Sequence, residues 1–213
     1  MSLQAELENV DVEFAKAPAA IRDPIMATRL DFAKSFDPSG AIKVGQKIPG
    51  FSLPDSVGKT VSSAELLAAG PLLITFYRGG WCPFCNLALH ALQARLPEIK
   101  AKGVTLVAIT PELPDSSLTT AEKQGLEYPV LSDVGNKFAH QLGIVWKQPD
   151  ELREVFAKIG NDLEKRNGDD SMEVPIPATL LVDRDGTVKN MFLDANYAKR
   201  VEPDVVVGWI NAL

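Results

Sequence analysis

The stretch ITFYRGGWCPFCNLALHALQ, Ile74–Gln93, contains both cysteines of the chain, Cys82 and Cys85. Apolar residues precede the pair without interruption, and apolar residues at three- and four-residue steps follow it, which predicts a buried strand, a short loop and an amphipathic helix. Cys82 is therefore expected at the N-terminus of this helix, with Cys85 one turn later on the same side. Pro83 suits the first helical position, where its missing N–H is not needed.

Strand and helix patterns alternate along the rest of the chain. The expected strands are Pro71–Tyr77, Val104–Thr110, a short strand in YPVLSD, and a hairpin in PATLLVDRDGTVKNMFL that turns at Asp-Gly. One helix is expected to start at Ser62, and another to follow the cysteines and end near Gly103. Four more helices are expected at Ser116–Gly125, Asn136–Leu142, Asp150–Arg166 and Pro203–Leu213. This order predicts an α/β fold in which helices flank both faces of a mixed central sheet.

The chain is expected to form one main domain with an extension. Residues 1–43 are expected to form a helical N-terminal extension, whose pattern is interrupted at Pro18 and Pro24. Residues 44–213 are expected to form the main domain, with a helical insertion at about residues 149–170. A length of 213 residues, of which 46% are hydrophobic, suffices for one sizeable core.

The composition argues against several classes of function. The 28 acidic and 22 basic side chains give a net charge of -6, and no basic stripe suggests binding to nucleic acid. No segment has the apolar length of a membrane span, and the start MSLQAELENVDVEF lacks the features of a signal peptide. We therefore expect a soluble cytoplasmic protein that binds neither nucleic acid nor membrane.

Two thiols three positions apart are expected to carry redox chemistry. A disulfide between them closes too small a loop to stabilise a chain of this length. At a helix N-terminus, unpaired N–H groups favour a thiolate, and a second thiol one turn on can form a disulfide with the first. A zinc site would need about four ligands, and only His90 and His140 could join the thiols, so no metal is expected. Both histidines are expected to be surface or helix-packing residues. A pair of inert buried thiols is the remaining alternative.

Several segments in order resemble the peroxiredoxins of the alkyl hydroperoxide reductase and thiol-specific antioxidant superfamily. These segments are VGQKIPGFSLPDSVGKTVS, LLITFY, VTLVAIT, YPVLSDVGNKFAHQLGI and LLVDRDGTV. The resemblance spans about residues 44–213 apart from the insertion. It implies a thioredoxin-like fold of the peroxiredoxin type, with no cofactor.

The candidate active site departs from the pattern of that family. Peroxiredoxins commonly contain P-x-x-x-[TS]-x-x-C, and in this register Arg78 replaces the proline, Cys82 replaces the hydroxyl residue and Cys85 has the peroxidatic position. Pro177 stands where these enzymes keep an arginine. Trp81 completes a thioredoxin-type W-C-P-F-C motif, and Pro177 resembles the cis-proline of thioredoxins, so we expect a cis Ile176–Pro177 bond.

The resemblance implies a thiol peroxidase that reduces hydrogen peroxide or organic hydroperoxides through a Cys82–Cys85 dithiol/disulfide cycle. The alternatives are a thiol-disulfide oxidoreductase that acts on protein disulfides, and a non-catalytic redox sensor or scaffold. An external thiol reductant such as a thioredoxin or glutaredoxin system is implied, and a homodimer is possible.

The identity of the first nucleophile stays open at this stage. Cys82 comes first at the helix start, so it is expected to be the more exposed and more acidic thiol. The peroxiredoxin register instead assigns the reaction with peroxide to Cys85. Arg78 is expected either to stabilise the thiolate or to lie exposed on the surface. Glu112, after the second long strand, is expected to be a solvated loop carboxylate.

Overall fold

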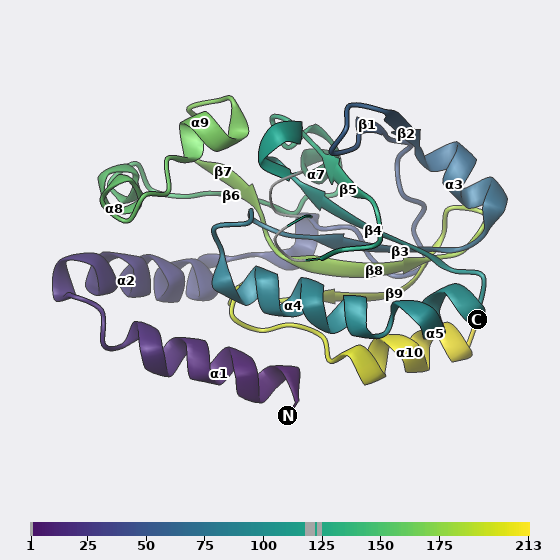
Figure 1. Ribbon diagram of the computed structural model, residues 1–213, viewed down its shortest axis with the longest axis horizontal. Coiled ribbons are helices and arrows are strands. Elements are labelled where there is room, and N and C mark those ends of the chain that lie inside the picture. Colours follow the sequence, from purple (N-terminus) through teal and green to yellow (C-terminus); the bar gives the residue numbers. More distant parts are fainter. Residues whose placement is uncertain (1, 118–121, 123–124) are drawn as a thin grey trace.

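The centre of the molecule is a mixed sheet, as predicted (Figure 1). In the computed structural model, which describes residues 2–117, 122 and 125–213, this sheet has five strands in the order β5-β4-β3-β8-β9. Its strands are β3 (Leu72–Phe76), β4 (Thr105–Thr110), β5 (Val130–Ser132), β8 (Ala178–Val182) and β9 (Val188–Leu193). β3, β4 and β5 run parallel, whereas β8 pairs antiparallel with β3 and with β9.

Helices cover both faces of this sheet, so the inner strands are apolar on both sides. All five residues of β3 are buried: Leu73 belongs to one core cluster, and Leu72, Ile74 and Phe76 belong to the other. One face carries α4 (Pro83–Ala94), α5 (Leu96–Ala101) and α10 (Pro203–Asn211) (Figure 1). The other face carries α3 (Ser63–Ala69), α7 (Lys137–Gln141) and the hairpin of β1 (Ser52–Pro54) with β2 (Thr60–Ser62).

The N-terminal segment folds into two helices that lie beside the sheet's α4 face (Figure 1). α1 (Leu3–Phe14) packs on α4, and its residues Leu3 and Leu7 are part of the main core. A break at Pro18 was predicted correctly, since this residue immediately precedes α2 (Ala19–Ser35). The predicted break at Pro24 is wrong, because Pro24 lies inside α2. A 3₁₀ turn, Pro38–Gly40, follows.

The insertion contains two helices, so the single helix predicted over Asp150–Arg166 is wrong. α8 (Leu152–Lys158) and α9 (Leu163–Asn167) are separated at Gly160, whose φ of 78° suits a residue without a side chain. The antiparallel strands β6 (Val145–Lys147) and β7 (Glu173–Pro175), which the sequence analysis did not anticipate, connect this insertion to the main domain. Ile21 and Ile25 of α2 pack against a cluster of buried side chains in the insertion, which we call the α8 cluster: Leu152, Val155, Phe156, Leu163 and Met172.

Two other helix predictions need comment. The helix after the cysteines is divided into α4 and α5, because Pro97 lacks the N–H that would continue the first helix. The helix predicted over Ser116–Gly125 lies for the most part outside the described residues. The division of the chain at residue 43 stays a prediction. Among the described residues, no helix is both long and apolar enough to cross a membrane.

We predict that α1 is an integral part of the fold. Leu7 is 1% exposed, so Leu7→Ala should lower the free energy of unfolding by about 2–4 kcal/mol, because it leaves a cavity in the core. Val12 lies on the same helix but is 58% exposed, and Val12→Ala should change the stability by less than about 0.5 kcal/mol. Chemical denaturation measures both values, and equal effects of the two substitutions would show that α1 does not share the core.

Candidate active site

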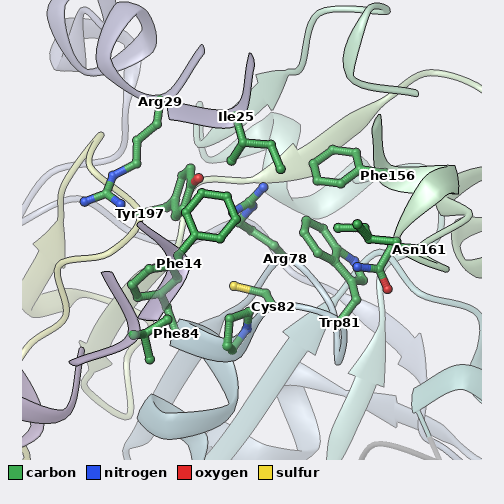
Figure 2. Close-up of a pocket in the computed structure, with 13 residues that line it drawn as sticks. Phe14, Ile25, Arg29, Arg78, Trp81, Cys82, Phe84, Phe156, Asn161 and Tyr197 are labelled. Atoms are coloured by element: carbon green, nitrogen blue, oxygen red, sulfur yellow. The ribbon is translucent and has the colours of Figure 1, made fainter. Parts of the chain in front are cut away.

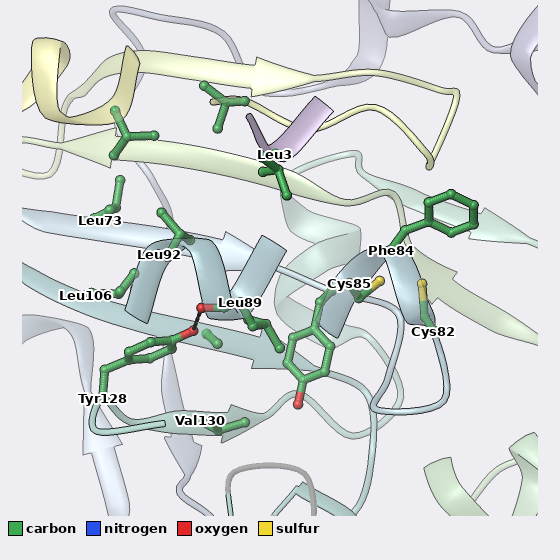
Figure 3. Packing of buried hydrophobic residues seen from close by; sticks show 14 of the residues in the cluster. Leu3, Leu73, Cys82, Phe84, Cys85, Leu89, Leu92, Leu106, Tyr128 and Val130 are labelled. Carbon is green, nitrogen blue, oxygen red and sulfur yellow. Dashed lines mark hydrogen bonds between the residues drawn. The ribbon is translucent and has the colours of Figure 1, made fainter. Parts of the chain in front are cut away.

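Both cysteines lie at the start of α4, where the sequence predicts them (Figure 3). Cys82 is the residue that precedes the helix, Pro83 opens it, and Cys85 lies in its first turn. The Cys85 backbone N–H donates to the Cys82 carbonyl at 3.0 Å. Both thiols are free, and the Cys82 thiol donates a hydrogen bond to the sulfur of Cys85. The two thiols are therefore close enough to form a disulfide with each other.

The structure contradicts the expectation that Cys82 is the more exposed thiol. Cys82 and Cys85 are each only 1% exposed. The sequence analysis considered only the strand, loop and helix around the motif, whereas α1, α2 and α8 also contribute residues to the cavity at Cys82. Distant segments of the chain therefore shield both sulfur atoms.

The expectation that Cys82 is the more acidic thiol is also wrong. Burial raises the pKa of Cys85, but the hydrogen bond from Cys82 and the positive charges of Arg200 and Arg78 outweigh burial and lower this pKa to about 5. Arg200 Nη2 donates to Cys85 Sγ at 3.3 Å. Burial, the hydrogen bond that it donates to Cys85 and the charge of Cys85 raise the pKa of Cys82 well above its ordinary value. The two thiols thus share one negative charge, which rests on Cys85.

Arg78 is a buried cation, so its interpretation as a surface residue is wrong. It is 3% exposed, and its guanidinium lies over the ring of Tyr197, 3.9 Å from the centroid, and over that of Trp81, 4.6 Å away. Its Nη2 donates to Gln148 Oε1 at 2.9 Å. Within the described residues, no carboxylate forms a salt bridge with Arg78. A buried guanidinium needs a counter-charge, and the neighbouring thiolate supplies one.

Glu112 is fully buried, so the expectation of a solvated carboxylate is wrong. Its carboxylate accepts hydrogen bonds from the Gly80 N–H at 2.8 Å and from Arg166 at 3.0 Å. Burial raises the pKa of Glu112, against the opposing effects of these two donors. Gly79, with a φ of 147°, leaves space for the Trp81 indole, because an added Cβ would lie 2.3 Å from its Nε1. Glu112 and Gly79 thus shape the loop before Cys82.

Pro177 is buried directly before β8, but the predicted cis bond is wrong, because the Ile176–Pro177 peptide is trans. Its neighbour Ile176 belongs to the core cluster that contains both cysteines. His90 is exposed on α4, and the half-exposed His140 contacts Glu173 at 2.7 Å, so both histidines lie at the surface as expected. The described residues contain no group of three or more His, Cys, Asp or Glu side chains that could hold a metal ion.

Three residues of the site escaped the sequence analysis. Arg200 and Tyr197 belong to the segment between β9 and α10, more than a hundred residues after the cysteines, and Gln148 follows β6. Their types carry no local signal for a role near a thiol. β9 is an edge strand of the sheet, and the segment that follows it passes the start of α4, where Arg200 contacts Cys85.

A cavity of about 90 Å³ opens beside Cys82 (Figure 2). Apolar and aromatic side chains form most of its wall, and the sulfur of Cys82 points into it. Its lining residues are Val10, Phe14, Ile25, Arg29, Arg78, Trp81, Cys82, Pro83, Phe84, Phe156, Ile159, Asn161 and Tyr197. Cys85 is not among them, although its thiol interacts with that of Cys82.

The mixed sheet, its flanking helices and the Cys-x-x-C at the start of α4 define a protein of thioredoxin-like fold. Residues 44–191 match the model of the AhpC/TSA family, and the chain belongs to this family. Peroxiredoxin Bcp of Escherichia coli is 26% identical over 170 residues, which cover 80% of this chain and 96% of that protein. The prediction of a peroxiredoxin-like thiol peroxidase is confirmed at the level of the family.

Two further similarities bear on the site. The crystal structure of peroxidoxin BcpB from Mycobacterium tuberculosis superimposes with a TM-score of 0.64 at 20% identity, covering 81% of this chain and 98% of that one, which shows the shared fold. Thiol-disulfide oxidoreductase ResA of Bacillus thuringiensis is 23% identical over 162 residues, covering 76% of each chain. The chain is thus similar both to a peroxidoxin and to a thiol-disulfide oxidoreductase.

We predict that Arg200 keeps the thiolate pKa low. Ultraviolet thiolate absorbance of the reduced protein should titrate with a midpoint at about 5, and Arg200→Met should move this midpoint upward, since the lost charge stabilised the anion. Lys199→Met removes the same charge from a half-exposed neighbour that pairs with Asp194, and it should leave the midpoint in place. An unchanged midpoint in Arg200→Met would contradict the role of the Arg200 contact.

Proposed function

We propose that this chain reduces peroxides with Cys85 as the peroxidatic thiol and Cys82 as the resolving thiol. The observation that carries the proposal is the contact of Arg200 with Cys85 beside the buried Arg78. Two cations and the Cys82 thiol favour the anion on Cys85, and the thiolate is the nucleophilic form of cysteine. The peroxidatic position of Cys85 in the peroxiredoxin register supports the same assignment.

In the first step, the Cys85 thiolate attacks one oxygen of the peroxide. An S–O bond forms and the O–O bond breaks, which oxidises the sulfur to a sulfenic acid and releases an alkoxide or hydroxide that takes up a proton. Because Cys82 lines the cavity and Cys85 does not, a peroxide in the cavity reaches Cys85 only after the Cys82 side chain has turned aside. The Arg78 guanidinium is placed to stabilise the negative charge that develops on the departing oxygen.

In the second step, Cys82 attacks the sulfenic sulfur of Cys85. The Cys82–Cys85 disulfide forms, and the hydroxyl group leaves as water with the proton of the Cys82 thiol. Cys82 also replaces the hydroxyl residue of the usual peroxiredoxin motif, since its thiol donates the hydrogen bond that Thr or Ser would provide. One residue therefore has both a supporting and a resolving role.

An external dithiol then returns the pair to the reduced state, and we infer a thioredoxin or glutaredoxin system in this role. Reduction by such a system, which keeps cytosolic thiols reduced, supports a cytoplasmic location. A homodimer stays a prediction from the family resemblance.

A thiol-disulfide oxidoreductase is the second candidate, and the W-C-P-F-C motif and the likeness to ResA favour it. Such an enzyme needs a sulfur that a protein disulfide can reach. Both cysteines here are 1% exposed, and the cavity before Cys82 has a volume of about 90 Å³. The burial of the pair therefore favours a small peroxide as substrate.

Single-cysteine variants test the assignment. Mixed with hydrogen peroxide in a stopped-flow instrument, Cys82→Ser should react within about threefold of the wild-type rate and accumulate a sulfenic acid, because Ser keeps a hydroxyl donor for the thiolate. Cys85→Ser should react at least about a hundredfold more slowly, because burial, the largest cause that raises the pKa of Cys82, persists in this variant.

The reverse pattern would assign the peroxidatic role to Cys82. Turnover of insulin disulfides by the wild type, measured in parallel, should be slow. Rapid insulin reduction together with peroxide oxidation no faster than that of free cysteine would overturn the peroxidase in favour of the reductase.

A further inference from the structure

The cavity beside Cys82 is built in large part by segments that surround the redox motif rather than contain it. Val10, Phe14, Ile25 and Arg29 come from α1 and α2, outside residues 44–191 that match the family model. Phe156, Ile159 and Asn161 come from the insertion between β6 and β7. The N-terminal helices and the insertion therefore supply seven of the thirteen lining residues.

These two groups of helices meet over the cavity. Ile25 of α2 packs against the α8 cluster, and the Phe156 ring lies 5.2 Å from the Trp81 ring, measured between centroids. Figure 2 shows Phe14, Ile25 and Phe156 around one side of the space into which Cys82 points. We call these three side chains the apolar wall.

The charged groups of the cavity differ in their free hydrogen-bonding capacity. Both terminal nitrogens of Arg29 donate to Asp11, at 2.5 and 2.9 Å, and its Nε donates to Asn196 at 2.9 Å. Arg78, in contrast, is 3% exposed, and its Nε has no hydrogen-bond partner among the described residues. Arg29 is thus committed to Asp11 and Asn196, whereas Arg78 lines the cavity beside Cys82 without a carboxylate partner among the described residues.

A hydroperoxide with a small apolar group matches this cavity, because it has a polar O–O unit at one end and a hydrocarbon part at the other. Its O–O unit can lie beside Cys82 and the positive charge of Arg78, while its hydrocarbon part replaces water at the apolar wall. Hydrogen peroxide has no group for that wall. A volume of about 90 Å³ limits the hydrocarbon part to a compact one.

We propose that Phe14, Ile25 and Phe156 are specificity-determining residues that select compact organic hydroperoxides over hydrogen peroxide. This inference rests on the proposed peroxidase function. It assigns a role in substrate selection to the N-terminal helices and to the insertion, which hold the three residues.

The test compares oxidation of the reduced full-length protein by tert-butyl hydroperoxide and by hydrogen peroxide, followed through the change in tryptophan fluorescence, to which Trp81 beside Cys82 contributes. The wild type should react faster with tert-butyl hydroperoxide. Ile25→Asn and Phe14→Asn, placed on different helices, should each lower the ratio of the two rate constants by about tenfold, because each removes apolar contact with the substrate. Leu30→Asn, on the exposed side of α2, should leave the ratio unchanged.

Two results overturn the inference in distinguishable ways. If the wild type reacts rapidly but prefers hydrogen peroxide, or if both cavity variants keep the wild-type ratio, the apolar wall does not select the substrate, and the peroxidase itself stands. If neither peroxide oxidises the wild-type thiols faster than it oxidises free cysteine, the peroxidase and the selectivity fail together.

Discussion

The site depends on the attraction between two guanidinium groups and one thiolate. Arg78 is buried among aromatic rings, and Arg200 donates to Cys85 Sγ at 3.3 Å. A buried cation without a carboxylate partner is costly, and a thiolate on Cys85 reduces that cost. The hydrogen bond with Cys82 and this attraction together lower the pKa of Cys85 despite its burial. Stability of the site and reactivity of the thiol therefore have a common physical origin.

Burial of the pair comes from parts of the chain that the motif does not include. α1 and α2 cover the start of α4 on one side, and the α8 cluster packs against Ile21 and Ile25 of α2. α1 is held in place from the opposite end of the sequence, since Glu202 accepts hydrogen bonds from the backbone of Leu3 and Gln4. The N-terminal helices therefore contact Glu202, at the start of the last helix, and also supply residues to the wall of the cavity.

Local patterns in the sequence suffice for most of the fold. The apolar run of β3, the periodic α4 and the Asp-Gly turn between β8 and β9 each carry a strong signal, and their order predicts the mixed sheet. The division of the insertion at Gly160 and the pairing of β6 with β7 carry weaker signals, because short elements depend on tertiary contacts.

The site is harder to predict than the fold. The positions of Cys82, Cys85 and Pro83 follow from periodicity, but the burial that decides which thiol is acidic depends on distant contacts. Arg200 reaches Cys85 across 115 positions of sequence. Glu112 has the sequence context of a loop, and only the fold shows that Gly80 and Arg166 surround it.

The central claim is that one peroxide molecule consumes both thiols and joins them. Mass spectrometry of the peptide that contains Cys82 and Cys85, after the reduced protein has reacted with one equivalent of hydrogen peroxide, tests this most directly. The account predicts that both thiols disappear together and that the peptide loses two hydrogen atoms. A stable sulfenic or sulfinic acid on one cysteine beside a free thiol on the other would contradict it.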